Sequence, residues 1–79
     1  MRNEMLKTLV EQLRIEYPKG TTVELVEMKD RYTKLSKGLN GTVSHVDDIG
    51  TIHVNWENGS SLGVVYGVDK IIKIIKKQM

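Results

Sequence analysis

The sequence predicts a mainly-β protein, a five-stranded small barrel preceded by one N-terminal amphipathic α-helix. Three observations support this prediction. Apolar residues recur at helical spacing over residues 3–16. Residues 39–61 show strand-like alternation interrupted by two strong turn signals. Short stretches rich in β-branched residues flank this centre, at residues 21–28 and 70–75.

The first element is the expected helix, Asn3 to Glu16. Asn3 is a suitable N-cap, and Pro18 with Gly20 ends the helix. Its apolar stripe has three-and-four spacing and consists of Leu6, Leu9, Val10, Leu13 and Tyr17. Two roles remain open for this stripe, because it can cover an open end of the barrel or form an interface in a homo-oligomer. A small barrel with one helix has a thin core, which oligomerisation commonly supplements.

The first strand is expected over Thr21 to Met28, with Val23 and Leu25 on one face. Val26 and Met28 then lie on the opposite face. Apolar residues on both faces imply that both are at least partly covered.

The next segment, residues 29–37 (KDRYTKLSK), has no apolar periodicity and predicts a long polar loop. Long loops on a small rigid scaffold often carry binding residues. This loop combines a guanidinium, a phenol and ammonium groups, in Arg31, Tyr32, Lys34 and Lys37. The alternative interpretation of the same residues is an ordinary solvated loop.

A three-stranded meander is expected over residues 39–61. Its first two strands are Thr42 to Val46 and Thr51 to Trp56, joined by an Asx-rich turn at Asp47 to Gly50. Apolar residues alternate along the second of these strands and include Trp56. Trp56 is therefore expected in the core rather than in a binding site.

The first strand of this meander needs a bulge. Val43 and Val46 differ in parity although both have the character of core residues. A bulge at Ser44-His45 places both valines on the core face. A bulged, strongly bent meander is how a small sheet closes into a barrel.

The second hairpin loop is expected at residues 57–59, with its last residue, a glycine, in the left-handed conformation. This three-residue loop sets Val64 opposite Ile52 and Leu62 opposite Val54. A two-residue turn would move the whole apolar set to the wrong face.

The fourth strand is expected at Ser61 to Tyr66, followed by a one-turn connector at Gly67 to Asp69. Lys70 to Ile75 then closes the barrel as a short β-branched strand. The second apolar face of this strand needs a cover from the helix or from a neighbouring subunit. Its isoleucines fall on both faces, Ile72 and Ile74 on one, Ile71 and Ile75 on the other.

Composition narrows the class of protein. A length of 79 residues suits one domain, with the helix in residues 1–17 and the barrel in residues 18–79. The absence of cysteine excludes a disulfide framework and a cysteine-ligated metal. No apolar run approaches the ~20 residues of a membrane span and no signal peptide is evident, so a cytoplasmic protein is expected. The net charge of +2, from 12 basic and 10 acidic residues, permits an anionic ligand but is weak for a committed duplex-DNA binder.

No arrangement of residues predicts catalysis, and we expect neither a cofactor nor a metal. His45 and His53 are expected to approach each other across a hairpin, but two histidines without ligand-type spacing are more typical of solvent-facing strand positions. Asp47 and Asp48 are expected to serve their turn rather than acid–base chemistry. No Gly-rich phosphate loop precedes a helix. We therefore expect a non-enzymatic protein.

The order of elements resembles an SH3-like barrel. The run Gly41-x-Val43-x-x-Val46-Asp47 also resembles the KOW motif of ribosomal and transcription-elongation proteins. From Tyr17 to Ile75, the patterns YPKGTTVELVEM and GLNGTVSHVDDIGTIHVNWENGSSLGVVYGVDKI are similar to a small-barrel family, domain of unknown function 4314, of phages and mobile elements of Firmicutes-type hosts. That family often has a proline where this chain has Tyr66. The resemblance implies the barrel and a phage or mobile-element origin, and it names no active site.

Three binding functions fit these observations. The preferred hypothesis is sequestration of a small phosphorylated signal of the cyclic-nucleotide type, in pockets between subunits, to counter host defence in the host cytoplasm. Phages encode small oligomeric proteins of this kind, and Arg31, Tyr32 and Tyr66 can supply phosphate donors and an aromatic face, with Lys34 and Lys37 beside them. One alternative is a protein–protein module that inhibits or recruits a host protein. The other is a KOW-like nucleic-acid-binding module, supported by Arg31, Lys34, Lys37, Lys70 and Lys73 around one end.

Overall fold

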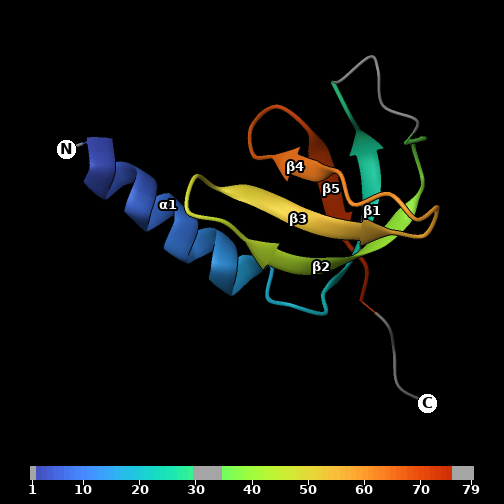
Figure 1. Cartoon of the computed structure of the whole chain (residues 1–79), viewed down its shortest axis with the longest axis horizontal. Coiled ribbons are helices and arrows are strands. Elements are labelled where there is room, and N and C mark those ends of the chain that lie inside the picture. Colours follow the sequence, from blue (N-terminus) through green and yellow to red (C-terminus); the bar gives the residue numbers. More distant parts are fainter. Residues whose placement is uncertain (1, 30–34, 76–79) are drawn as a thin grey trace.

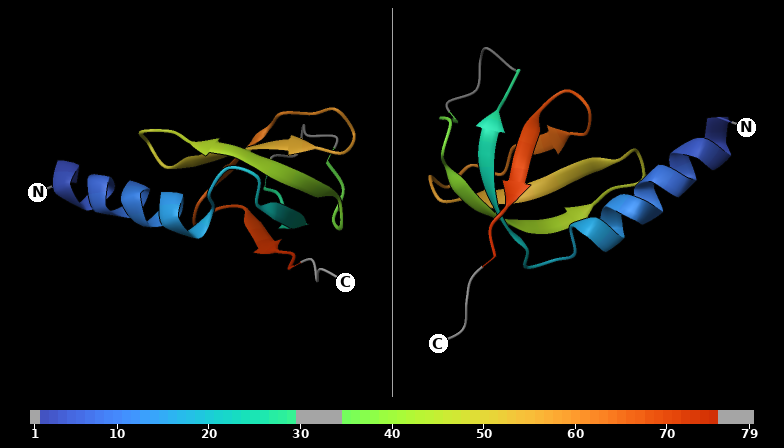
Figure 2. Two further views of the ribbon diagram at one scale, coloured as in Figure 1. Left: turned by 90° about the horizontal axis from the view of Figure 1, so that it is seen from below. Right: turned by 180° about the vertical axis from the view of Figure 1, so that it is seen from behind.

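The structure, a computed structural model, describes residues 2–29 and 35–75 of the chain (Figure 1). The strands form one antiparallel sheet in the order β4-β3-β2-β1-β5, so the last strand returns to pair with the first. The predicted fold class, mainly β with one N-terminal helix, is confirmed, and the curled sheet is consistent with a small barrel (Figure 2). Within the described residues one helix precedes five strands: α1 (Arg2–Glu16), β1 (Thr22–Glu27), β2 (Asn40–Val46), β3 (Thr51–Trp56), β4 (Gly63–Val65) and β5 (Lys70–Lys73).

The β2–β3 hairpin contains the bulge that the parity of its valines predicted. Val43 pairs with Val54, whereas the next paired residue on β2 is His45. Ser44 is the extra residue, and skipping it returns Val46 to the core face. Val43 and Val46 are both buried in the core, so this prediction is confirmed.

The β3–β4 hairpin has the predicted three-residue loop. Trp56 donates its backbone N–H to the carbonyl oxygen of Ser60 at 2.8 Å. Gly59, the last loop residue, has a φ of +90°, in the left-handed region. The loop sets Val64 opposite Ile52, as predicted.

β4 is shorter than the predicted strand from Ser61 to Tyr66. Its ladder to β3 ends at Gly63, so the expected pairing of Leu62 with Val54 is not formed. The carbonyl oxygen of Leu62 instead accepts the indole N–H of Trp56 at 2.9 Å. This bond satisfies the one polar group of the buried Trp56 ring, whose predicted core position is confirmed.

β1 carries a second bulge, which the sequence pattern did not predict. β1 pairs with β5 through Leu25 and then through Glu27, which leaves Val26 as the extra residue. A bulge reverses the parity of the residues that follow it. Met28 therefore packs against the core, and its predicted place on the opposite face with Val26 is wrong.

β5 ends at Lys73, two residues before the predicted end of the strand at Ile75. Ile71 pairs with β1 and packs against the core. Ile72, on the opposite face of β5, is exposed, and Ile75 is exposed beyond the end of the strand, so it does not share the core face of Ile71 as predicted.

The connector at residues 67–69 is a hydrogen-bonded turn, as predicted. Asp69 ties this turn to the barrel with both of its carboxylate oxygens. Oδ2 accepts the backbone N–H of Val65 at 3.0 Å, and Oδ1 accepts that of Lys29 at 2.9 Å. One side chain thus joins the chain beyond β1, the end of β4 and the start of β5.

The C-terminal half of α1 fixes the helix to the barrel. Val10 and Leu13 are buried, and both lie against Gly50 in the β2–β3 turn. Arg14 donates its Nε–H to the carbonyl oxygen of Val46 at 3.1 Å. The N-terminal half of the helix projects beyond the sheet (Figure 2).

The remainder of the predicted apolar stripe is not fully buried. Leu6 is exposed, while Leu9 and Tyr17 are half-buried at the edge of the core. The helix also begins at Arg2, which places Asn3 inside the first turn and not at the predicted N-cap. α1 therefore covers the end of the β2–β3 hairpin and leaves the neighbouring end of the barrel open.

We predict that Gly59→Val destabilises the fold by about 1–2 kcal/mol, because a β-branched residue is strained at this φ of +90°. No neighbouring atom lies within 4 Å of the position of a Cβ at Gly59, so steric crowding does not contribute. Gly59→Asn is the control, since asparagine tolerates the left-handed region. Urea unfolding measures the difference, and equal stabilities of Gly59→Val and the wild type would contradict the assigned loop.

Candidate functional site

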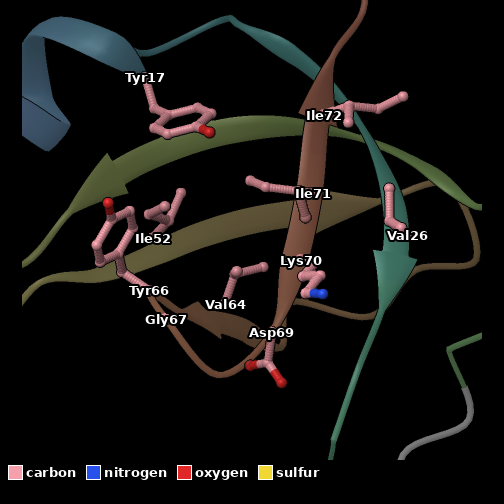
Figure 3. Close-up of a pocket in the computed structure, with 10 residues that line it drawn as sticks. All are labelled: Tyr17, Val26, Ile52, Val64, Tyr66, Gly67, Asp69, Lys70, Ile71 and Ile72. Atoms are coloured by element: carbon pink, nitrogen blue, oxygen red, sulfur yellow. The ribbon is translucent and has the colours of Figure 1, made fainter.

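An open hollow of about 430 Å³ lies at one end of the barrel, between β5, the β4–β5 turn and the end of α1 (Figure 3). We call it the barrel mouth. Hollows of this size on proteins commonly hold small molecules when apolar walls carry a few polar groups. The barrel mouth is lined by Tyr17, Val26, Ile52, Val64, Tyr66, Gly67, Asp69, Lys70, Ile71 and Ile72.

The floor of the barrel mouth is formed by the cross-strand pair Ile52 and Val64, which is buried in the core. The register of the β3–β4 hairpin therefore places these two side chains beneath the hollow. Val26 stands at the side of the mouth across from Tyr66, at the bulge of β1 (Figure 3). Ile71 of β5 stands between them.

Two tyrosines form the rim of the mouth nearest to α1 (Figure 3). Tyr17 follows the last turn of the helix and donates its backbone N–H to Leu13 O at 2.7 Å. Burial raises the pKa of the Tyr17 phenol, and the nearby Glu16 and Tyr66 add to the increase. Tyr66 follows β4 and is 57% exposed. Tyr17 therefore stays a neutral hydrogen-bond donor beside an accessible aromatic face.

Two lysines lie near the mouth in weak ion pairs. The Nζ of Lys73 is 5.6 Å from the centroid of the Tyr17 ring and 3.4 Å from the Glu16 carboxylate. The Nζ of Lys70 is 3.9 Å from the Glu27 carboxylate. Exposed pairs of this kind contribute little stability, so an anionic ligand can displace the carboxylate from either lysine at small cost.

The structure places the five predicted ligand residues differently. Tyr66 is on the rim of the barrel mouth. Lys37 is exposed and does not line the mouth. Lys29, and to a lesser extent Lys70 and Lys37, lowers the pKa of Glu27. The other three predicted residues lie outside the described residues: Arg31, Tyr32 and Lys34.

Tyr17 was assigned from sequence to the apolar stripe of the helix and not to a site. The available signal was its position one residue before Pro18, where the helix must end and its last side chain can face a neighbouring element. The sequence offered no signal that Val26 and Ile71 would line a hollow. The bulge at Val26 alters the pairing of β1 with β5 and so decides which way their side chains face.

A second cluster, the two histidines on the β2–β3 hairpin, does not form a metal site. The rings of His45 and His53 stack with centroids 4.4 Å apart and an interplanar angle of 9°. Imidazole nitrogens bind metals in the plane of the ring, so two parallel stacked rings cannot both direct lone pairs at one ion. Among the described residues, no group of three or more histidines and carboxylates has metal-binding geometry.

Asp47 organises the turn beside these histidines, as predicted. Its Oδ2 lies 2.8 Å from the Nε2 of His53, and its Oδ1 accepts the backbone N–H groups of Thr51 and Ile49 at 2.9 and 3.1 Å. The hydrogen bond with His53, followed by these backbone bonds, lowers the pKa of Asp47. Asp48 forms an ion pair with Arg14 at 3.0 Å and so also serves the fold.

The Oγ of Ser44 lies 3.0 Å from the Nδ1 of His45, a distance that a nucleophile and its base would have. A catalytic set also needs a third group that orients the histidine. The adjacent carboxylate, that of Asp47, is bonded to His53 instead. The arrangement therefore matches a surface hydrogen bond better than an activated nucleophile.

The fold and the barrel mouth define a class of small protein, one helix on a five-stranded sheet with an open apolar hollow at its end. The chain belongs to the family described as domain of unknown function (DUF4314), whose model matches residues 6–74. The match includes most of α1, which the resemblance in sequence had left outside its specific part. No curated protein and no solved structure matches the chain. Within the described residues, no helix has the length and apolar character needed to span a membrane.

We predict that Asp47 stabilises the fold at neutral pH and loses this effect in acid. Its folded-state pKa is below the ordinary value of 3.8, so the stabilisation is present above pH 3.8 and disappears as the pH falls through the folded value. Asp47→Asn should be less stable than the wild type at pH 7, and the difference should shrink as the pH falls below 3.8 and through the lowered pKa of Asp47.

Thermal unfolding between pH 7 and pH 2.5 tests this prediction, with Asp48→Asn as the neighbouring control. A difference between wild type and Asp47→Asn that stays constant over the whole range would show that the Asp47 charge is not responsible.

Proposed function

We propose that this is a non-enzymatic binding protein that sequesters a small phosphorylated ligand of the cyclic-nucleotide type in the barrel mouth. The observation that carries the proposal is the mouth itself, an apolar hollow with two tyrosines on one rim and lysines nearby. Sequestration requires only binding, which agrees with the lack of an orienting carboxylate for the Ser44–His45 pair.

The chemistry of the mouth matches both parts of such a ligand. A base can lie over the Ile52 and Val64 floor and stack on the exposed ring of Tyr66. Its phosphate can then accept hydrogen bonds from Lys70 and Lys73, which bind phosphate as mobile point charges. The Tyr17 hydroxyl adds a neutral donor.

The residues predicted from the 29–37 loop remain part of this proposal. Lys29 is bonded to Asp69, which lines the mouth, and Arg31 and Tyr32 follow it in sequence. We propose that Arg31 grips phosphate through paired hydrogen bonds, that Tyr32 covers the base, and that Lys34 and Lys37 add positive charge. These roles follow from residue chemistry.

The setting that we propose is a phage or mobile element, in which the protein counters a host defence signal in the host cytoplasm. Two observations support this setting. The sequence resembles a family of phages and mobile elements, and the barrel mouth is suited to bind a ligand without converting it. Two other classes of partner, a nucleic acid and a host protein, are outcomes of the experiments below. Against a nucleic acid, the net charge of +2 provides only a weak positive field for a long polyanion.

We predict that a cyclic mono- or dinucleotide raises the melting temperature of the wild-type protein and that Tyr66→Ala abolishes the shift. Tyr66→Phe is the matched control, because it keeps the stacking ring and removes only the hydroxyl. The exposed Tyr66 contributes little to the core, so both variants should fold. A thermal-shift screen provides the measurement, and an equal shift in Tyr66→Ala and wild type would place the ligand elsewhere. If no phosphorylated ligand shifts the melting temperature, the protein-partner alternative replaces this proposal.

We also predict that Lys70→Ala weakens nucleotide binding roughly tenfold, the effect of losing one charge-assisted hydrogen bond. Lys7→Ala is the control, since Lys7 is exposed on α1 and does not line the mouth. Arg31→Ala should reduce binding at least as much. Titration calorimetry at low and physiological salt separates the ligand classes. If the affinity falls by orders of magnitude between the two salt concentrations, the ligand is a nucleic acid that is bound through several phosphates. The affinity for a single nucleotide should fall much less.

A further inference from the structure

A second hollow, of about 430 Å³, lies between the C-terminal end of α1 and the bulge of β2. It shares Tyr17 with the barrel mouth, and the rest of its lining differs. None of the residues that line it is acidic. We call it the basic hollow, and its polar lining residues besides Tyr17 are Arg14, Lys19, Ser44 and His45.

Backbone hydrogen bonds hold the two sides of the basic hollow together. The connection from α1 to β1 passes beside β2 (Figure 1), where Gly20 donates its N–H to the carbonyl oxygen of Val43 at 2.8 Å. Val43 in turn donates its N–H to the carbonyl oxygen of Thr21 at 2.8 Å. Gly20 directly follows Lys19, and Val43 directly precedes Ser44. These bonds therefore fix the backbone from which both lining residues project.

The guanidinium of Arg14 is held in place at one wall of the basic hollow. Its Nε–H is bonded to the carbonyl oxygen of Val46 at 3.1 Å, and its Nη2 lies 3.0 Å from the Asp48 carboxylate. These two bonds use only part of the N–H fork, whose geometry matches the oxygens of a phosphate. The side chain of Asp48 is 97% exposed, so its ion pair contributes little stability and an anion can compete with it.

The bulge of β2 supplies the opposite wall, through Ser44 and His45. Successive residues of a regular strand face opposite sides of the sheet, but the bulge brings both of these to one hollow. The Nδ1 of His45 lies 3.0 Å from the Oγ of Ser44, and the ring stacks on His53. Both contacts orient the exposed His45 ring. With its Nδ1 engaged, the Nε2 of His45 is the ring nitrogen that can meet a ligand.

We propose that the basic hollow binds a phosphate dianion, either free phosphate or the end group of a phosphorylated small molecule. Arg14 and Lys19 provide permanent positive charge, and Ser44 and His45 provide hydrogen-bond donors. These groups come from α1, the α1–β1 connection and β2, and they surround one hollow. They therefore suit a single phosphate group rather than the extended backbone of a nucleic acid. The site is separate from the barrel mouth and does not depend on the proposed function.

NMR titration of the full chain with inorganic phosphate at pH 8 and constant ionic strength tests the proposal with the pair Lys19→Ala and Lys37→Ala. Both lysines are exposed, but Lys37 does not line the basic hollow. The amide signals of Lys19 and Ser44 should shift until they saturate. Lys19→Ala should weaken binding roughly tenfold, and Lys37→Ala should leave it unchanged. Shifts that do not saturate, or equal losses in the two variants, would overturn the proposal.

Glycerol phosphate, titrated in parallel, distinguishes the two sources of the dianion. Tighter binding than that of inorganic phosphate assigns the hollow to the end group of a small molecule. Weaker binding assigns it to free phosphate. In both cases Lys19→Ala should reduce the affinity by the same factor.

Asp48→Asn tests the role of Arg14 without removing the bond that holds Arg14 to Val46. The substitution eliminates the carboxylate that competes with an anion for the guanidinium, so phosphate should bind several-fold more tightly. The exposed Asp48 side chain makes this variant compatible with folding. Unchanged or weaker binding would contradict the participation of Arg14.

Sulfate isolates the contribution of His45, because sulfate stays a dianion between pH 8 and pH 6. The charged and titratable groups that line the hollow or contact the ring are Arg14, Tyr17, Lys19, His53 and, through its bond to His53, Asp47. The wild type should bind sulfate several-fold more tightly at pH 6, since a protonated imidazole adds a positive charge. His45→Asn should lose most of this gain. An equal gain in His45→Asn would exclude His45 from the site and overturn the proposed arrangement.

Discussion

The bulge at Ser44 in β2 is the constraint on which the rest of the structure depends. By inserting one residue between two core valines, it puts both Val43 and Val46 in the core. It also directs the β2–β3 turn toward the helix, where Gly50 meets Val10 and Leu13. Without the extra residue, the end of the hairpin would present its other face, and the helix would lose its apolar contact.

Because that turn is its contact with the sheet, α1 is attached by its C-terminal half. The helix ends at Glu16, directly before Tyr17 on the rim of the barrel mouth, and its N-terminal half extends away from the barrel. The mouth stays open, and one side of the helix stays uncovered. The small core thus leaves a hollow at the end of the barrel that can accept a ligand. The Asp69 carboxylate preserves the shape of the mouth, since it links three segments around the rim.

Much of the fold could be predicted from the sequence, because side-chain alternation and turn geometry depend on residues that are close together in the chain. Residue parity alone required the bulge near Ser44, and it also selected the three-residue loop ending at Gly59 that sets Val64 opposite Ile52. The bulge at Val26 could not be predicted, because it depends on how β1 accommodates β5, a strand distant in sequence. For the same reason, the sequence placed Tyr66 among the candidate ligand residues but not Tyr17 and Val26, which line the mouth only through tertiary packing.

The central claim is that the barrel mouth is the binding site of this protein. Methyl and aromatic NMR spectra of the full chain, recorded while a cyclic nucleotide is added, test it residue by residue. We expect the largest shifts at the Ile52, Val64 and Ile71 methyl groups and at the Tyr17 and Tyr66 rings, with the His45 and His53 rings unchanged. Shifts confined to the histidine hairpin, or none with any phosphorylated ligand, would contradict the account.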